Sequence, residues 1–80
     1  MAVRLVEYNI EYDSVDILYT RGTDTFSKIV TLRALETLIN AVKGGSKTEM
    51  REEDKGLLDE IIKLGGMDWV RTEIDNLMDI

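Results

Sequence analysis

The side chains with the greatest capacity for chemistry lie in one charged segment, residues 46–66. This segment, SKTEMREEDKGLLDEIIKLGG, contains six carboxylates and four basic groups. If it forms a helix that begins near residue 47, helical spacing places most of the acids in one stripe, opposite the apolar side chains. The stripe consists of Glu49, Glu52, Glu53, Asp59 and Glu60.

Carboxylates can transfer protons or bind calcium and magnesium, but this pattern indicates neither role. No acidic pair is set among apolar residues that would adapt it to proton transfer, and no D-x-D-x-D-G loop is present. The chain contains no histidine and no cysteine, so it cannot build the usual zinc sites, Ser-His-Asp triads or Cys-His pairs. The GGSKT sequence at 44–48 lacks the first glycine and the strand of a phosphate-binding loop. The sequence therefore predicts a protein that is not an enzyme and needs no cofactor or metal.

Two interpretations of the acidic stripe remain open. In the functional one, it binds a protein with a basic surface, or imitates a run of phosphates inside a nucleic-acid-binding groove. In the other, it is an ordinary solvated helix face, where Asp59 pairs with Lys63 and Glu52 with Lys55. The solvated face is the commoner case for charges at such spacing.

The aromatic residues offer further candidates for a binding surface. Tyr8 and Tyr12 are expected on one strand face with Arg4, as in a base-stacking sheet, but their acidic neighbours favour core packing or a protein interface. Trp69 falls off the apolar stripe of the last helix, so it either anchors an interface or covers a helix hairpin. We therefore add Trp69 and Tyr12 to the candidate partner-binding residues.

The net charge of -6 argues against nucleic-acid binding, because a negative chain repels the phosphate backbone. Most of the excess lies in residues 46–80, which carry ten acids and five bases. No apolar run approaches the roughly 18 residues of a membrane helix. Together with the absence of cysteine, this leads us to expect a cytoplasmic protein that binds no membrane.

Residues 3–30 have the composition of a small antiparallel sheet of two to three strands. Val3–Tyr12 and Val15–Thr20 alternate in polarity, and residues 25–30 are a third strand or the run-in to a helix, with the strand favoured. In the first strand the even positions, from Val6 through Tyr8 and Ile10 to Tyr12, are expected to share one face.

Three helices are expected next, at residues 31–43, 47–64 and 68–78. Thr31 is the predicted N-cap of the first, and Ser46 with Glu49 forms a capping box for the second. Glycine pairs at 44–45 and 65–66 end the first two helices. Gly56 indicates either close approach by another backbone or a second helix that begins only near Glu53. The chain is thus predicted to be a single α+β domain, residues 1–80, with its helices on one face of the sheet.

From these features we expect a small acidic protein-interaction module, which inhibits a host or partner protein in the manner of a phage or prophage antagonist. The second function class is a homo-oligomeric structural or assembly subunit, whose apolar faces are buried between copies. The third is a helix-turn-helix variant that binds nucleic acid. It is disfavoured because the last helix carries a single base, Arg71, among the acids Asp68, Glu73, Asp75 and Asp79.

Overall fold

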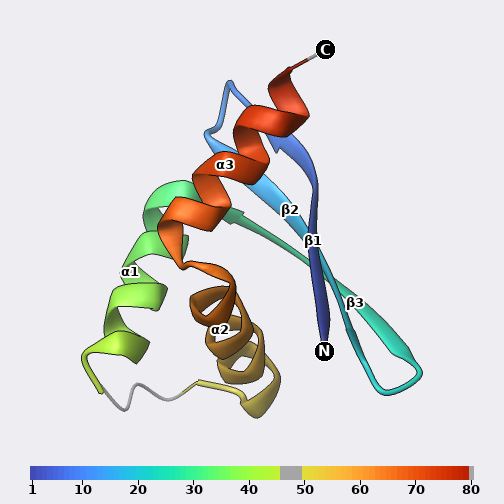
Figure 1. Ribbon diagram of the computed structural model, residues 1–80, viewed down its shortest axis with the longest axis vertical. Helices are drawn as coiled ribbons and strands as arrows, with labels where there is room; N and C mark the ends of the chain where they lie inside the picture. Colours follow the sequence, from blue (N-terminus) through green and yellow to red (C-terminus); the bar gives the residue numbers. More distant parts are fainter. Residues whose placement is uncertain (46–49, 80) are drawn as a thin grey trace.

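The protein is a three-stranded antiparallel sheet followed by three helices, an α+β fold, as predicted (Figure 1). The computed structural model describes residues 1–45 and 50–79. The strands are β1 (Ala2–Asn9), β2 (Ser14–Arg21) and β3 (Asp24–Thr31), and the helices are α1 (Leu32–Lys43), α2 (Glu52–Leu64) and α3 (Met67–Met78). None of the helices in these ranges is long and apolar enough to cross a membrane.

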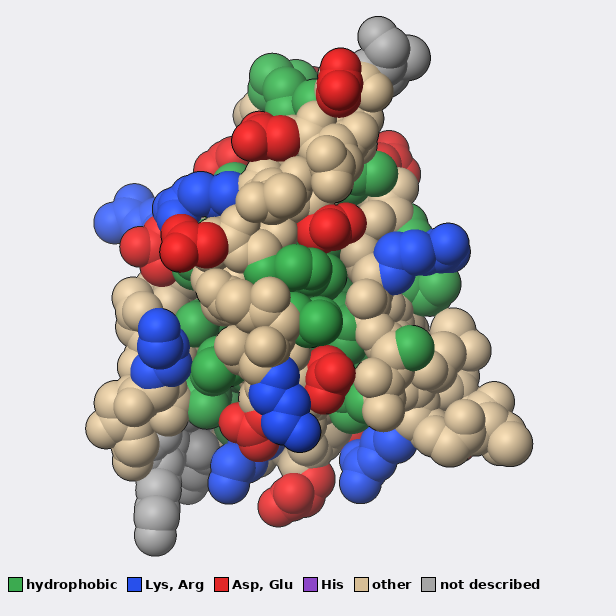
Figure 2. Space-filling view, viewed as in Figure 1, with side chains coloured by type: hydrophobic (Ala, Val, Ile, Leu, Met, Phe, Trp, Pro, Cys, Tyr) green, Lys and Arg blue, Asp and Glu red, His purple; other side chains and the backbone are tan. Residues whose placement is uncertain are grey.

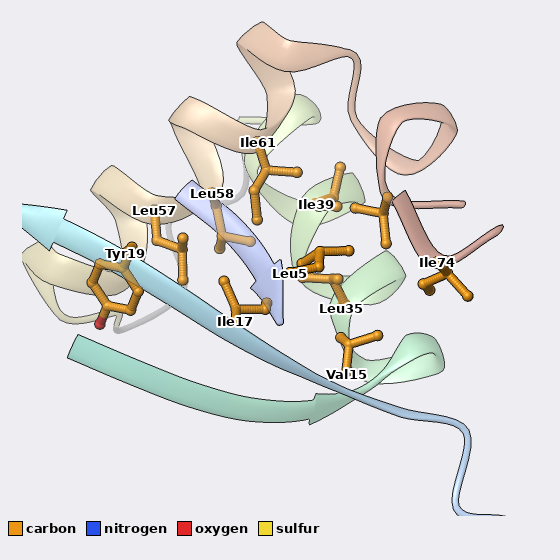
Figure 3. Close-up of a cluster of buried hydrophobic side chains, with 11 residues drawn as sticks. Leu5, Val15, Ile17, Tyr19, Leu35, Ile39, Leu57, Leu58, Ile61 and Ile74 are labelled. Carbon is orange, nitrogen blue, oxygen red and sulfur yellow. The ribbon is translucent and has the colours of Figure 1, made fainter. Parts of the chain in front are cut away.

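The core lies between the sheet and the helices. Three alternate residues of the central strand β2, Val15, Ile17 and Tyr19, are buried and point toward the helices (Figure 3). Apolar side chains from every helix pack on them, and β1 adds one more. These buried partners are Leu5, Leu35, Ile39, Leu57, Leu58, Ile61, Val70 and Ile74.

The strand order is β1-β2-β3, so β2 has a neighbour on each side and the other two strands are edges. β2 and β3 pair from Ser14 opposite Thr31 to Arg21 opposite Asp24 without a register shift. They are joined by a two-residue turn in which Gly22 has a φ of 64°, a conformation that glycine adopts at no steric cost. This confirms that residues 25–30 are strand.

β1 differs from the sequence-based prediction in its faces and its length. Its register with β2 shifts between Leu5 and Glu7, which leaves Val6 as a bulge. Leu5 before the bulge and Tyr8 after it both lie opposite buried residues of β2, so the inward positions change from odd to even. The strand ends at Asn9, and the next residues form a turn. The prediction that the even positions 6–12 share one face is therefore wrong.

The helix boundaries agree with the prediction except at the start of α2. The Thr31 hydroxyl accepts the Ala34 N–H at 3.1 Å, which confirms the N-cap of α1. Gly65 and Gly66, with φ of 136° and 67°, turn the chain from α2 into α3. A second helix running from residue 47 is wrong, because Arg51 is extended and α2 begins at Glu52. This agrees with the alternative that the helix begins only near Glu53.

Three successive acids in the first turn of α2, Glu52, Glu53 and Asp54, suit the positive end of the helix dipole and mark its start. The Ser46–Glu49 capping box lies outside the described residues. At Gly56, an added Cβ would meet the Met1 Cε at 3.2 Å. The close approach at this glycine is thus made by the side chain of the chain's own first residue and not by another backbone.

Candidate functional site

The acids of the predicted stripe lie on the outer side of α2, together with two lysines. Glu52 and Asp59 are exposed, Glu53 and Glu60 are partly buried, and Glu49 lies outside the described residues. Lys55 and Lys63 are exposed on the same helix, and Figure 2 shows basic and acidic side chains interspersed over it. Because two lysines lie among the four described acids, the negative field of the outer face of α2 is weaker than that of an uninterrupted acidic stripe.

One acid of α2 outside the stripe is engaged with the sheet. The Asp54 carboxylate lies 3.1 Å from the Lys28 ammonium, and both side chains are largely buried, at 26% and 32% exposure. Lys28 points to the helix side of β3, since it lies opposite the buried Ile17. This ion pair therefore ties α2 to the sheet.

Trp69 is partly buried and packs against the core cluster. A Cβ added at Gly65 would lie 3.1 Å from the Trp69 Cβ, so the start of α3 closes tightly over the end of α2. Of the two interpretations of this residue, the structure places it as the cover of the helix hairpin.

Tyr12 is exposed at 68%, in a turn that joins β1 to β2, and Ile10 in the same turn is exposed at 73%. We refer to residues 10–13 as the hairpin turn. It lies at the end of β1 opposite to Met1, which contacts α2 at Gly56. Tyr12 and the acids of α2 therefore do not form one continuous surface. Nor does Tyr12 share a face with Tyr8, so the two tyrosines do not build a base-stacking platform.

The hairpin turn is held in one conformation by hydrogen bonds to both of its flanks. The Asn9 Oδ1 accepts the N–H groups of Glu11 at 3.0 Å and Tyr12 at 3.3 Å, an Asx turn. Asp13 has a φ of 50°, and its carbonyl accepts the Leu32 N–H at 2.9 Å, which ties the turn to the start of α1. The turn is thus a rigid support for Ile10 and Tyr12.

A side-chain contact reinforces the same turn. The Tyr8 hydroxyl donates a hydrogen bond to the Asp13 carboxylate. This hydrogen bond raises the pKa of Tyr8 above its ordinary value, and partial burial and the negative charge of Asp13 act in the same direction. The tyrosine therefore remains a protonated donor at neutral pH.

A shallow hollow of about 180 Å³ adjoins the turn on the sheet face that the helices leave uncovered. It is lined by Glu7, Asn9, Ser14, Asp16 and Ile29. The two carboxylates lie directly opposite each other on β1 and β2. One oxygen, the Asp16 Oδ1, is buried and accepts no hydrogen bond from the described residues. A cationic group in the hollow would offset the two like charges.

Acids outnumber bases around the hairpin turn, where Arg33 follows the Leu32 that is hydrogen-bonded to Asp13. Residues 5–20 contain four carboxylates and no lysine or arginine. The C-terminal end of α3 lies at the same end of the molecule (Figure 1) and adds the acids Asp75 and Asp79 with the half-exposed Met78. This end therefore combines exposed apolar side chains with an acidic border, which the outer face of α2 does not.

Sequence reasoning selected Tyr12 here but missed Ile10 and the hollow, because it extended the first strand through residue 12. Asn9 and Asp13, which bracket the turn, are the signal that could have ended the strand earlier. No group of three or more acids placed to hold a metal ion occurs among residues 1–45 and 50–79. No protein-family model, curated protein or solved structure matches this chain, and its function is therefore inferred from the geometry of the hairpin turn and its neighbours.

Proposed function

We propose that this protein is a non-catalytic interaction module that binds another protein through the hairpin turn and the adjoining hollow. The partner presents a lysine or arginine beside an apolar surface, and the module inhibits the partner by occupying that surface. The acidic border of the turn and hollow supplies the electrostatic complement.

The observation that carries this proposal is the exposure of two large apolar side chains, Ile10 at 73% and Tyr12 at 68%, on one rigid turn. Single exposed apolar residues are common on protein surfaces, but two of them on a four-residue turn are less so. Tyrosine is enriched among the residues that dominate binding energy. Because the turn is already ordered by its hydrogen bonds, binding costs little conformational entropy.

The hollow explains what kind of partner the turn would select. Glu7 and Asp16 face each other across the strands, and the Asp16 Oδ1 accepts no hydrogen bond from the described part of the chain. A partner ammonium or guanidinium seated in the hollow would lower the repulsion between the two carboxylates. The other acids near the turn would mainly increase the rate of association with such a partner.

The experiment that tests this proposal is affinity capture from a lysate of the source cell, followed by mass spectrometry. The wild type is compared with an Ile10→Ser, Tyr12→Ser double variant. Leu64→Ser is the matched control, because Leu64 is also an exposed apolar residue, at 44%, but lies at the end of α2. We expect one protein to be retained by the wild type and the control and lost by the double variant.

The captured protein is then purified and its dissociation constant measured at low and high salt. The double variant should bind at least tenfold more weakly, since loss of a dominant interface residue costs 1.4 kcal/mol or more. Asp16→Asn should weaken binding and flatten its salt dependence. If a Glu52→Lys, Glu60→Lys variant loses the partner while the double variant keeps it, the binding surface is α2 and the proposal fails.

Nucleic-acid binding through α3 is the weakest of the three function classes. The single base of α3, Arg71, lies 3.1 Å from the Glu36 carboxylate of α1, so its charge is already paired. A helix bordered by acids and with its one base engaged is poorly suited to a groove lined by phosphates. A shift of labelled DNA at low salt would restore this alternative.

A further inference from the structure

We infer that the free edge of β3 is a self-association surface, on which two copies of the chain pair their β3 strands antiparallel about a twofold axis. The two three-stranded sheets would then join into one continuous sheet. This inference goes beyond the proposed binding of a partner at the hairpin turn. It names the surface through which the chain would form a homo-oligomer.

The two edges of the sheet are protected very differently. β1 carries the bulge at Val6, the exposed charges of Arg4 and Glu7, and the packing of α3 against it. Bulges, charges and covering elements are the devices by which proteins prevent edge strands from pairing. This edge is therefore closed to a further strand.

β3 has no bulge, and its charges are limited to Asp24 and Lys28. It pairs with β2 without a register shift, contains no proline, and consists mainly of residues that favour strands, DTFSKIVT. Its one base, Lys28, is turned to the helix side and bound to Asp54. A long, regular edge strand of this composition exposes backbone N–H and C=O groups that another strand can bind.

The sequence of β3 is complementary to itself in one antiparallel register. With the twofold axis at Phe26, Asp24 faces Lys28 of the second copy, and the same contact repeats on the other side of the axis. Phe26 faces its equivalent, and it is already ordered by stacking on Tyr19, with ring centroids 5.4 Å apart. Opposite charges and aromatic pairs at facing positions both stabilise a sheet.

Charge also limits the alternative registers and occupants. An axis at Lys28 would place two ammonium groups opposite each other, which is unfavourable. β3 contains one acid and one base, so it is locally neutral although the chain carries -6. A second copy can therefore approach along this edge without the repulsion that the acidic ends of the molecule would impose. Antiparallel pairing of a strand with itself has the twofold symmetry of the commonest protein dimers.

The mass of the full chain in solution, measured by sedimentation equilibrium from micromolar to millimolar concentration, tests the inference. The wild type should approach twice 9.1 kDa as concentration rises. Asp24→Lys places two lysine pairs across the axis and should raise the dimer dissociation constant about tenfold or more. Asp59→Lys is the matched control, because it makes the same change in net charge at an exposed site of α2 and should leave the constant unchanged.

Cross-linking tests the register directly, because the chain has no cysteine of its own. In the register centred on Phe26, Thr25 faces Ser27 of the second copy at a separation that a disulfide can span. Thr25→Cys chains mixed with Ser27→Cys chains should therefore form a covalent dimer faster than either variant alone. Both substitutions are at exposed positions.

The inference is overturned if the wild type stays monomeric at every concentration, or if Asp24→Lys dimerises as tightly as Asp59→Lys. Binding of an extended peptide by a strictly monomeric chain would assign the edge to a different occupant. The Ile10→Ser, Tyr12→Ser variant should dimerise like the wild type. Loss of partner capture and loss of the dimer therefore report on two separate surfaces.

Discussion

The hairpin turn and the outer face of α2 are both rich in carboxylates, but they differ in what accompanies those charges. On α2, the apolar side chains Leu57, Leu58 and Ile61 are directed into the core, and two lysines lie among the acids outside. In the hairpin turn, Ile10 and Tyr12 are directed into solvent, and most of the charges around them are negative. The density of acids along the sequence is therefore a poor guide to a binding surface. The position of the apolar side chains relative to the acids is a better one.

The same difference predicts how the two regions respond to mutation. α2 contributes to the fold through burial and through the ion pair of Asp54 with Lys28. The hairpin turn contributes through backbone hydrogen bonds that do not involve the side chains of Ile10 and Tyr12. Substitutions on α2 should thus change stability, and substitutions of the two exposed turn residues should change binding.

The largest expected effect is that of Ile61→Ala, because Ile61 is completely buried. Removal of a buried isoleucine side chain should lower the free energy of unfolding by about 2–5 kcal/mol. Ile10→Ala removes the same atoms from an exposed site and should change the free energy of unfolding by less than about 0.5 kcal/mol. Urea unfolding of both variants measures the contrast. A loss of more than about 1 kcal/mol in Ile10→Ala would show that the turn side chains support the fold.

The next effect concerns the two glycines at the end and in the middle of α2. Gly65→Ala should cost about 1–3 kcal/mol, because its φ of 136° is unfavourable for alanine and the new Cβ would lie 3.1 Å from the Trp69 Cβ. Gly56→Ala should instead stabilise by about 0.5 kcal/mol, since the helix gains alanine propensity and the Met1 Cε is the mobile end of a side chain. Thermal unfolding of the two variants decides this, and destabilisation by Gly56→Ala would mean that Met1 is rigidly packed.

Local signals predicted most of this fold. The apolar spacing of α1 and α3, the N-cap at Thr31 and the glycine pairs act within a few residues, so the sequence pattern contains them. The bulge at Val6 could not be predicted in this way, because it depends on how β1 aligns with β2. The start of α2 was misplaced because a capping-box pattern outweighed the three successive acids Glu52–Asp54.

The candidate site was less predictable than the fold. Tyr12 was selected for its residue type, but its exposure follows from a strand that ends at Asn9, which alternating polarity alone does not reveal. The hollow brings Glu7 together with Asp16, residues on different strands whose proximity depends on the register after the bulge. The register of two strands depends on the whole sheet, so it cannot be predicted from the sequence of β1 or of β2 alone.

A smaller difference in stability is expected between substitutions of two acids of α2, Asp54 and Glu52. Asp54→Asn should lower the free energy of unfolding by about 1 kcal/mol, because it removes both the partly buried pair with Lys28 and a charge at the helix N-terminus. Glu52→Gln, in the same helical turn, should cost only about 0.3 kcal/mol, since it removes the N-terminal charge alone. Urea unfolding at low and high salt measures both, and equal losses would show that the pair with Lys28 contributes nothing.

The smallest expected effect is a pH dependence that belongs to the hairpin turn. The hydrogen bond to Asp13 raises the pKa of Tyr8 in the folded protein. Below the unfolded value of about 10, the phenol is protonated in both states and the contact contributes fully. As the pH rises past that value, the unfolded chain releases the proton first, so stability falls until the raised pKa is passed.

Tyr8→Phe should abolish this loss of stability at alkaline pH. Tyr12→Phe keeps the contact between Tyr8 and Asp13 and should therefore still show the loss. Urea unfolding from pH 8 to about pH 11 compares the two variants. If the two curves coincide, the Asp13 carboxylate does not hold the Tyr8 proton. The rigidity of the turn would then rest on Asn9 and on the Asp13 carbonyl alone, and an Asn9→Ala variant should loosen it enough to weaken partner binding without altering the β3 dimer.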